Sequence, residues 1–185
     1  MADQGTEGLL SPFLRKLRIR AAAPYIYGRV LDVGCGSGEL ASIVTEENYC
    51  GFDIDGESIA LAVKKYPTHD FVNTEPPKNQ SFDTIVSLAV IEHVSDPVDF
   101  LSHWSRYLKN SNGCKFVLTT PHPSIETIHT IGAKCGLFSK HGSEEHEELI
   151  DYERMQKISK KAGLKIIVFK KFLLGMNQLF VLSIR

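Results

Sequence analysis

The sequence predicts a single α/β domain built on a mostly parallel sheet of seven strands with an antiparallel last strand. Three observations support this prediction. Short apolar runs alternate with stretches at helical spacing over most of the 185 residues, which is typical of strands joined by crossover helices. A glycine-rich turn, residues 34–38, follows the first apolar run. Two β-rich runs, 164–173 and 178–184, close the chain with four residues between them, and this spacing predicts an antiparallel hairpin.

Composition indicates an ordinary soluble globular protein, with 43% hydrophobic and 23% charged residues. A net charge of −1 argues against a dedicated nucleic-acid binder, so no nucleic-acid partner is expected. No apolar stretch is long enough to span a membrane, and residues 1–8 are too polar for a secretory signal. No Cys-x-x-Cys pair occurs, so we expect a cytoplasmic protein with reduced thiols at Cys35, Cys50, Cys114 and Cys135.

The first predicted element is a helix within an N-terminal segment, residues 1–27. It starts at Ser11-Pro12, a hydroxyl cap followed by proline in the first helical position. The interpretation favoured here is a solvated basic face on a helix at the domain edge. Weak contact with an anionic membrane surface, or with an acidic substrate, is the alternative. The cations of this face are Arg15, Lys16, Arg18 and Arg20.

The next apolar run, residues 29–33, reads as a buried strand. Gly34, Gly36 and Gly38 follow on alternate positions and leave room for a ligand against the main chain. Apolar residues at helical spacing then predict a helix from Ser37 or Gly38 onward, whose free N–H groups point into the loop. The residues that carry this spacing are Leu40, Ala41, Ile43 and Val44.

The spacing G-x-G-x-G differs from the dinucleotide pattern G-x-G-x-x-G. Asp32 stands two residues before the first glycine. A carboxylate there is a poor neighbour for a pyrophosphate and a good one for an α-ammonium or a sulfonium. The alternative is a tight turn that serves packing alone.

A second strand ends in Asp53, which lies 19 positions after Gly34 (53 − 34), where a carboxylate can accept both ribose hydroxyls of a nucleoside. Asp55 is expected to cap the following helix, over 57–66. The remaining predicted elements are strands over 69–72, 81–88 and 114–120, and helices over 97–108 and 152–162 with caps at Asp96 and Asp151.

With these residues the sequence resembles the class I S-adenosylmethionine-dependent methyltransferases, whose first cofactor motif corresponds to residues 31–38 (LDVGCGSG). The resemblance covers most of the chain. It implies one Rossmann-like domain over 1–185 with helices on both faces of the sheet, and S-adenosylmethionine as cofactor. The implied cofactor residues are Asp32, Gly34, Cys35, Gly36, Gly38, Leu88 and Ala89 around the methionine end, Asp53 and Ile54 on the ribose side, and Glu75 near the adenine, with Asn73 as the second choice to Glu75.

Residues 89–93 (AVIEH) resemble the fourth-strand motif of enzymes that O-methylate ubiquinone precursors, several of which carry E-x-x-E-H. Some of those enzymes hold a divalent metal with this motif. Ala89 replaces the first glutamate, and Glu92 with His93 are too few ligands for a Mg²⁺ or Ca²⁺ cage, so no metal site is predicted. His93 is the first candidate for a general base and His122 the second. Alternatively, Glu92-His93 only shapes a helix turn.

The alternation of strand-like and helix-like stretches is interrupted over residues 121–150. The position of this segment after the fifth strand predicts a substrate-facing insert. Taken singly, each histidine of this insert is more typical of a surface residue than of a catalyst. They are His122, His129, His141 and His146.

These expectations combine into a methyltransferase that acts on a small-molecule or lipid-linked acceptor, with O-methylation as the first choice. A catalytically silent cofactor-binding module and an RNA methyltransferase are the alternatives. An NAD-dependent oxidoreductase is disfavoured by the loop spacing and by the terminal hairpin. The identity of the acceptor and the oligomeric state stay open at this point.

Overall fold

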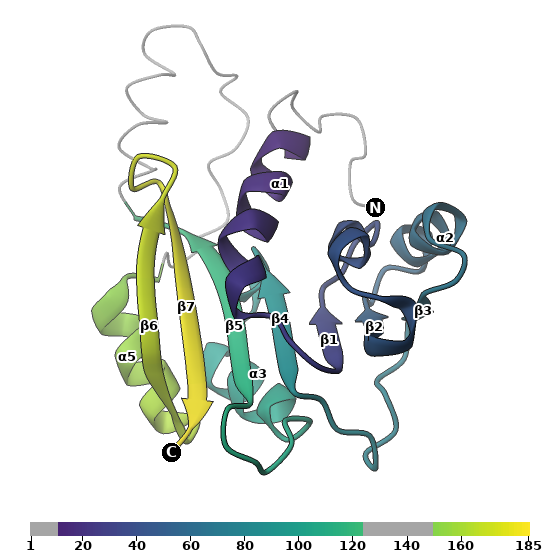
Figure 1. Ribbon diagram of the computed structural model, residues 1–185. Coiled ribbons are helices and arrows are strands. Elements are labelled where there is room, and N and C mark those ends of the chain that lie inside the picture. Colours follow the sequence, from purple (N-terminus) through teal and green to yellow (C-terminus); the bar gives the residue numbers. More distant parts are fainter. Residues whose placement is uncertain (1–10, 124–149) are drawn as a thin grey trace, which may run out of the picture.

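The computed structural model describes residues 11–123 and 150–185. Its strands form one seven-stranded sheet in the order β3-β2-β1-β4-β5-β7-β6 (Figure 1). The pairs among the first five strands are parallel, whereas β7 runs antiparallel to both β5 and β6. This arrangement confirms the predicted fold class. The strands are β1 (Val30–Val33), β2 (Tyr49–Phe52), β3 (Asp70–Val72), β4 (Thr84–Leu88), β5 (Lys115–Pro121), β6 (Leu164–Phe172) and β7 (Asn177–Ile184).

Helices cover both faces of the sheet, as predicted, with α1 on one face and α3 and α5 on the other (Figure 1). The central strands therefore bury side chains in two directions. Phe116 of β5 packs in the cluster that includes α3 and α5, and the next residue, Val117, packs in the cluster on the α1 side. The helices are α1 (Ser11–Ala22), α2 (Gly56–Lys65), α3 (Pro97–Ser105) and α5 (Tyr152–Lys161), with 3₁₀ helices η1 (Ala23–Tyr25), η2 (Glu39–Ile43), η3 (Glu46–Asn48) and η4 (Ile91–His93).

All three predicted aspartate caps are confirmed. Asp55 accepts the backbone N–H groups of Glu57 and Ser58 before α2. Asp96 accepts two backbone N–H groups at the start of α3, and Asp151 accepts the backbone N–H of Arg154 at the start of α5. The boundaries differ by a few residues. Helix α3 ends at Ser105 rather than at Leu108, because Leu108 leaves the helix to form an isolated β-bridge with Phe82.

The prediction of an α-helix from Ser37 or Gly38 onward is wrong. The segment forms only the short 3₁₀ helix η2, and Val44 is already extended. Three β-branched residues in a row, Ile43 to Thr45, explain the early end, because their restricted side chains favour extended backbone. The glycine loop is therefore not followed by a full α-helical N-terminus.

Several predictions fall outside the described residues: the loose start before residue 11, most of the insert at 121–150, and His129, His141 and His146. Cys135 lies there too, whereas Cys35, Cys50 and Cys114 are free thiols as expected. The division into a segment over 1–27 and an insert over 121–150 stays a prediction. No helix in the described part of the chain is long and apolar enough to cross a membrane.

Candidate functional site

A cleft of about 260 Å³ lies at the carboxyl ends of β1 and β4. One wall is α1, which contributes Arg15, Arg18 and Ile19, and the other is the glycine loop. The end of the parallel part of a sheet is where ligands of this fold class bind. The predicted cofactor residues found in the lining are Asp32, Gly34, Cys35, Gly36, Leu88 and Ala89.

The three glycines of the loop have positive φ, and they differ in what surrounds them. A Cβ on Gly34 would lie 2.4 Å from the Val90 side chain, and one on Gly38 would lie 2.7 Å from the Phe71 ring. A Cβ on Gly36 would meet nothing within 4 Å. Gly34 and Gly38 are thus required by packing, and Gly38 does not line the cleft. The open space at Gly36 is what a ligand lying against the main chain needs.

Asp32 is a buried carboxyl group, 3% exposed, at the floor of this cleft. Burial raises its pKa to about 7, and the nearby Asp53 carboxylate adds to this effect. The opposing influence is the hydroxyl of Tyr49, which donates a hydrogen bond of 2.8 Å to Asp32 Oδ2. A ligand cation would favour the charged form of this carboxyl group.

Asp53 lies at the end of β2 and uses both carboxylate oxygens. Oδ2 accepts the backbone N–H of Gly36 at 2.8 Å, and Oδ1 accepts that of Asp55 at 2.9 Å. Each oxygen keeps a second lone pair for a ligand hydroxyl. The neighbouring Ile54 is 87% exposed and offers an apolar surface. Both residues stand beside the 260 Å³ cleft rather than in its lining.

Glu75 is held against α3. Its Oε2 lies 3.1 Å from His103 Nε2 and accepts a hydrogen bond of 3.4 Å from the Tyr107 hydroxyl. It is not in the lining of the cleft, so its predicted place near the adenine stays a prediction.

Two arginines of α1 belong to the site, which the interpretation of a solvated basic face missed. Arg15 Nη1 donates to Ser37 Oγ at 3.4 Å, and Arg18 Nε donates to Asn177 Oδ1 at 3.3 Å. Lys16 and Arg20 are exposed, as expected. The available signal was the spacing of Arg15, Arg18 and the apolar Ile19, which places all three on one side of the helix.

Buried polar groups gather beyond the end of β4. Ala89 has a φ of +59° and donates its N–H to Thr119 O at 2.9 Å. Glu92, 7% exposed, follows in η4, and burial raises its pKa. The Thr120 hydroxyl lies close enough to Glu92 to lower its pKa in opposition to burial, and the buried hydroxyl of Thr119 has no hydrogen-bond partner among the described residues. An unpartnered group of this kind is rare in protein interiors and marks this edge as a site for polar ligands.

The structure places the two candidate bases on different segments. His93 is exposed at the end of η4. His122 follows β5, and its Nε2 lies 2.8 Å from Lys171 Nζ. Burial and the Lys171 ammonium lower the pKa of His122. Neither histidine lines the 260 Å³ cleft. No group of three or more metal-ligating side chains occurs among residues 11–123 and 150–185, and metal dependence stays untested.

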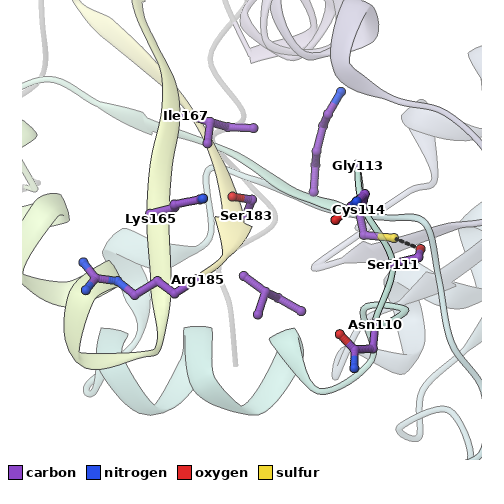
Figure 2. Close-up of a pocket in the computed structure, with 11 residues that line it drawn as sticks. Asn110, Ser111, Gly113, Cys114, Lys165, Ile167, Ser183 and Arg185 are labelled. Atoms are coloured by element: carbon purple, nitrogen blue, oxygen red, sulfur yellow. Dashed lines mark hydrogen bonds between the residues drawn. The ribbon is translucent and has the colours of Figure 1, made fainter.

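A second, wider cleft of about 630 Å³ opens at the opposite end of the sheet (Figure 2). Its lining includes Lys165, Ser183 and Arg185 and contains no acidic side chain. Lys165 points toward Ser183, whereas the Arg185 guanidinium turns away and donates from Nε to Leu164 O at 2.9 Å (Figure 2). This cleft has neither the glycine loop nor a buried acid, so the candidate site is the one beside Asp32.

A family model described as a methyltransferase domain matches residues 8–168. A demethylmenaquinone methyltransferase of Chlorobaculum parvum is 26% identical over 159 residues, which cover 74% of this chain and 66% of that protein. A ubiquinone biosynthesis O-methyltransferase of Ruegeria sp. is 26% identical over 184 residues, covering 92% of this chain and 72% of that protein. The chain thus spans slightly less than two thirds of the length of the first of these relatives.

Solved structures show the same fold at low sequence identity. Magnesium protoporphyrin IX methyltransferase from Synechocystis PCC 6803, with bound SAH, superposes with a TM-score of 0.66 at 16% identity and covers 98% of this chain and 90% of its own. An S-adenosylmethionine-dependent methyltransferase from Clostridium acetobutylicum gives a TM-score of 0.67 at 14% identity, with 96% and 93% covered.

Proposed function

We propose that this chain, which belongs to the methyltransferase-domain family and is an S-adenosylmethionine-dependent methyltransferase, methylates an oxygen atom of a small-molecule or lipid-linked acceptor. The observation that carries the proposal is the match over 92% of the chain to an enzyme named ubiquinone biosynthesis O-methyltransferase. The match over 74% of the chain to a demethylmenaquinone methyltransferase supports a quinone-like acceptor. The buried polar groups beyond β4 support it, because they suit a polar acceptor next to the cofactor cleft.

The cleft fits the cofactor chemically. Bound S-adenosylmethionine supplies a methyl carbon that its sulfonium has already activated. Asp32 is the residue for the positive charge of the methionine end, and Gly36 leaves space for the ligand beside the loop. Arg15 and Arg18 are suited to the α-carboxylate. Asp53 is suited to the ribose hydroxyls.

In this proposal the protein mainly aligns the acceptor oxygen with the methyl carbon and excludes water. A base is needed only to take the proton of the attacking hydroxyl. His93, at the end of η4, is the first candidate and His122, after β5, is the second. The interaction of His122 with Lys171 favours a neutral imidazole, which is the form a base requires.

The test is a turnover assay that detects S-adenosylhomocysteine with a panel of acceptors. The panel contains phenols with short and with long prenyl tails, porphyrin carboxylic acids, and a structured RNA. Methylation of a phenol, confirmed by mass spectrometry, supports the proposal. Turnover with RNA alone, and its steep dependence on salt, would replace it with the RNA alternative. Binding of NAD in place of S-adenosylhomocysteine would contradict the reading of the cleft.

Two finer points belong to the same proposal. A cytoplasmic location is proposed on the free thiols of Cys35, Cys50 and Cys114. Contact of α1 with an anionic membrane would have to use Lys16 and Arg20, because Arg15 and Arg18 line the cleft. Sedimentation with vesicles of neutral and of anionic lipid checks this contact.

A further inference from the structure

A buried hydrogen bond links the start of β2 to the acid at the floor of the cleft. The two strands are parallel, with Val30 opposite Tyr49 and Asp32 opposite Gly51. Tyr49 is 3% exposed, and its hydroxyl donates to Asp32 Oδ2 at 2.8 Å. This is the one hydrogen bond to the Asp32 side chain among the described residues. The orientation of the carboxylate is therefore fixed by a residue that does not itself line the cleft.

The absence of a side chain at Gly51 makes this bond possible. A Cβ on Gly51 would lie 2.9 Å from the Tyr49 hydroxyl oxygen and 2.7 Å from a ring carbon of Phe71. Gly51 has no positive φ, so its backbone does not require glycine. The ring of Tyr49 is held edge-on by Phe71 and His69, at centroid distances of 5.3 and 5.5 Å. Residues of β2 and β3 thus hold the hydroxyl in place under the carboxylate.

We propose that Tyr49 is a positioning residue for the cofactor: its hydroxyl orients the Asp32 carboxyl group and stabilises the charged form that receives the cationic methionine end. This inference rests on the proposed placement of that end beside Asp32. It is independent of the acceptor and of the base. The tyrosine acts through Asp32 and has no contact with the ligand.

The charges around Asp32 set the direction of the effect. Burial raises the pKa of Asp32 to about 7, Tyr49 lowers it by its hydrogen bond, and Asp53 raises it. Burial also raises the pKa values of Tyr49, Cys35 and Cys50, so these neighbours are neutral at pH 7. The other charged groups in the cleft are Arg15, Arg18 and Glu39. Removing the hydroxyl is therefore expected to raise the pKa of Asp32 further.

The experiment compares two ligands by titration calorimetry between about pH 5.5 and 8.5, a range that brackets the pKa of Asp32. S-adenosylhomocysteine carries the α-ammonium, whereas 5′-methylthioadenosine lacks the amino-acid part. For Tyr49→Phe we expect a loss of about 3- to 10-fold in affinity for S-adenosylhomocysteine at pH 8, and an acid limb that begins at higher pH than in the unaltered protein. Affinity for 5′-methylthioadenosine should change less than about twofold, because this ligand lacks the amino-acid part that Asp32 is proposed to bind. Tyr25→Phe is the matched control, because Tyr25 is on the same side of the sheet and its ring lies under Lys170, away from Asp32.

Equal losses for the two ligands would overturn the proposal, because a merely structural tyrosine would disturb both. An unchanged acid limb would overturn it as well. If Tyr49→Phe does not fold, a carbon-13 NMR titration of Asp32 in the unaltered protein decides. A midpoint that falls on binding S-adenosylhomocysteine, with a Tyr49 ring-carbon shift that follows the same titration, supports the proposal, and a Tyr49 shift that does not respond to the titration of Asp32 contradicts it. Failure of the acceptor proposal is separate, since no acceptor is present in these measurements.

Discussion

The backbone N–H of Gly36 donates a hydrogen bond of 2.8 Å to Asp53 Oδ2, which ties the glycine loop to the end of β2. The other oxygen of Asp53 holds the N–H of Asp55, the cap of α2. The Asp53 carboxylate therefore holds the glycine loop in place, and in the proposed function it also accepts hydrogen bonds from the ribose hydroxyls. A change at Asp53 should affect the ligand site through both roles.

Asp53→Ala is expected to weaken binding of S-adenosylhomocysteine by roughly 1–3 kcal/mol, because charge-assisted hydrogen bonds to ligand and loop are lost. Titration calorimetry measures this change. Asp55→Ala is the control, because it removes only the cap of α2. It should lower the free energy of unfolding by about 1 kcal/mol and leave the affinity unchanged. An Asp53→Ala protein with unaltered affinity would refute the ribose assignment.

Gly36→Ala is expected to abolish tight cofactor binding while the domain stays folded. The new Cβ meets no protein atom within 4 Å, so it occupies the space assigned to the ligand. Positive φ costs about 1–2 kcal/mol for alanine. Gly163→Ala carries the same strain, since Gly163 also has positive φ and open surroundings, after α5 and away from the cleft. We expect the two variants to have equal thermal stabilities, and only Gly36→Ala to lose affinity for S-adenosylhomocysteine. If both variants bind S-adenosylhomocysteine alike, the ligand does not lie against Gly36.

The fold was predictable because its signals are local. The near-continuous apolar runs of the central strands, the aspartate caps and the terminal hairpin each depend on a few neighbouring residues. The failed prediction was the helix after Gly38, where helical spacing competed with the β-branched run at Ile43 to Thr45.

The site was predictable only in part, because some of its contacts join distant segments. Arg18 reaches Asn177 across 159 positions, and Tyr49 reaches Asp32 from the neighbouring strand. Nothing in the spacing of these residues indicates such contacts. Asp32, Gly34 and Gly36, by contrast, are close in sequence and do come together in one cleft, whereas Gly38, Asp53 and Glu75 lie outside its lining.

Asp32 gives a specific pH dependence of stability. Its pKa is about 7 in the folded protein and about 3.9 in an unfolded chain, so between these values the folded state holds a proton that the unfolded state has lost. Its contribution is fully present below pH 4 and is lost as the pH rises through 7, by on the order of 4 kcal/mol. Urea unfolding at pH 5 and pH 8 measures the part of this loss that falls between pH 5 and 7, about 3 kcal/mol. Asp32→Asn should flatten this slope, and Asp96→Asn, at the exposed start of α3, should not. Identical slopes in Asp32→Asn and the unaltered protein would contradict the assignment.

Arg18→Met is expected to weaken the binding of S-adenosylhomocysteine by about 1–3 kcal/mol, because the positive charge proposed to face the α-carboxylate is lost. Affinity for 5′-methylthioadenosine, which has no carboxylate, should not change. Lys16→Met removes a cation from the exposed side of the same helix and serves as the control. If Lys16→Met causes the same loss, the effect comes from the overall charge of α1 rather than from a contact in the cleft. A loss for both ligands in Arg18→Met would instead indicate a disturbed helix.

His93→Ala is expected to lower kcat by roughly 10²- to 10⁴-fold with little change in cofactor affinity, because a base acts only on the acceptor proton. The pH profile separates it from His122, whose pKa is lowered from its ordinary value of 6.5 by burial and by Lys171. If His122 is the base, His122→Ala shows the larger loss, and the acid limb of kcat in the unaltered enzyme lies below about pH 6.5. Equal loss of turnover and affinity in His93→Ala would assign it a structural role at the end of η4. Full activity of both variants would mean that the acceptor hydroxyl needs neither histidine.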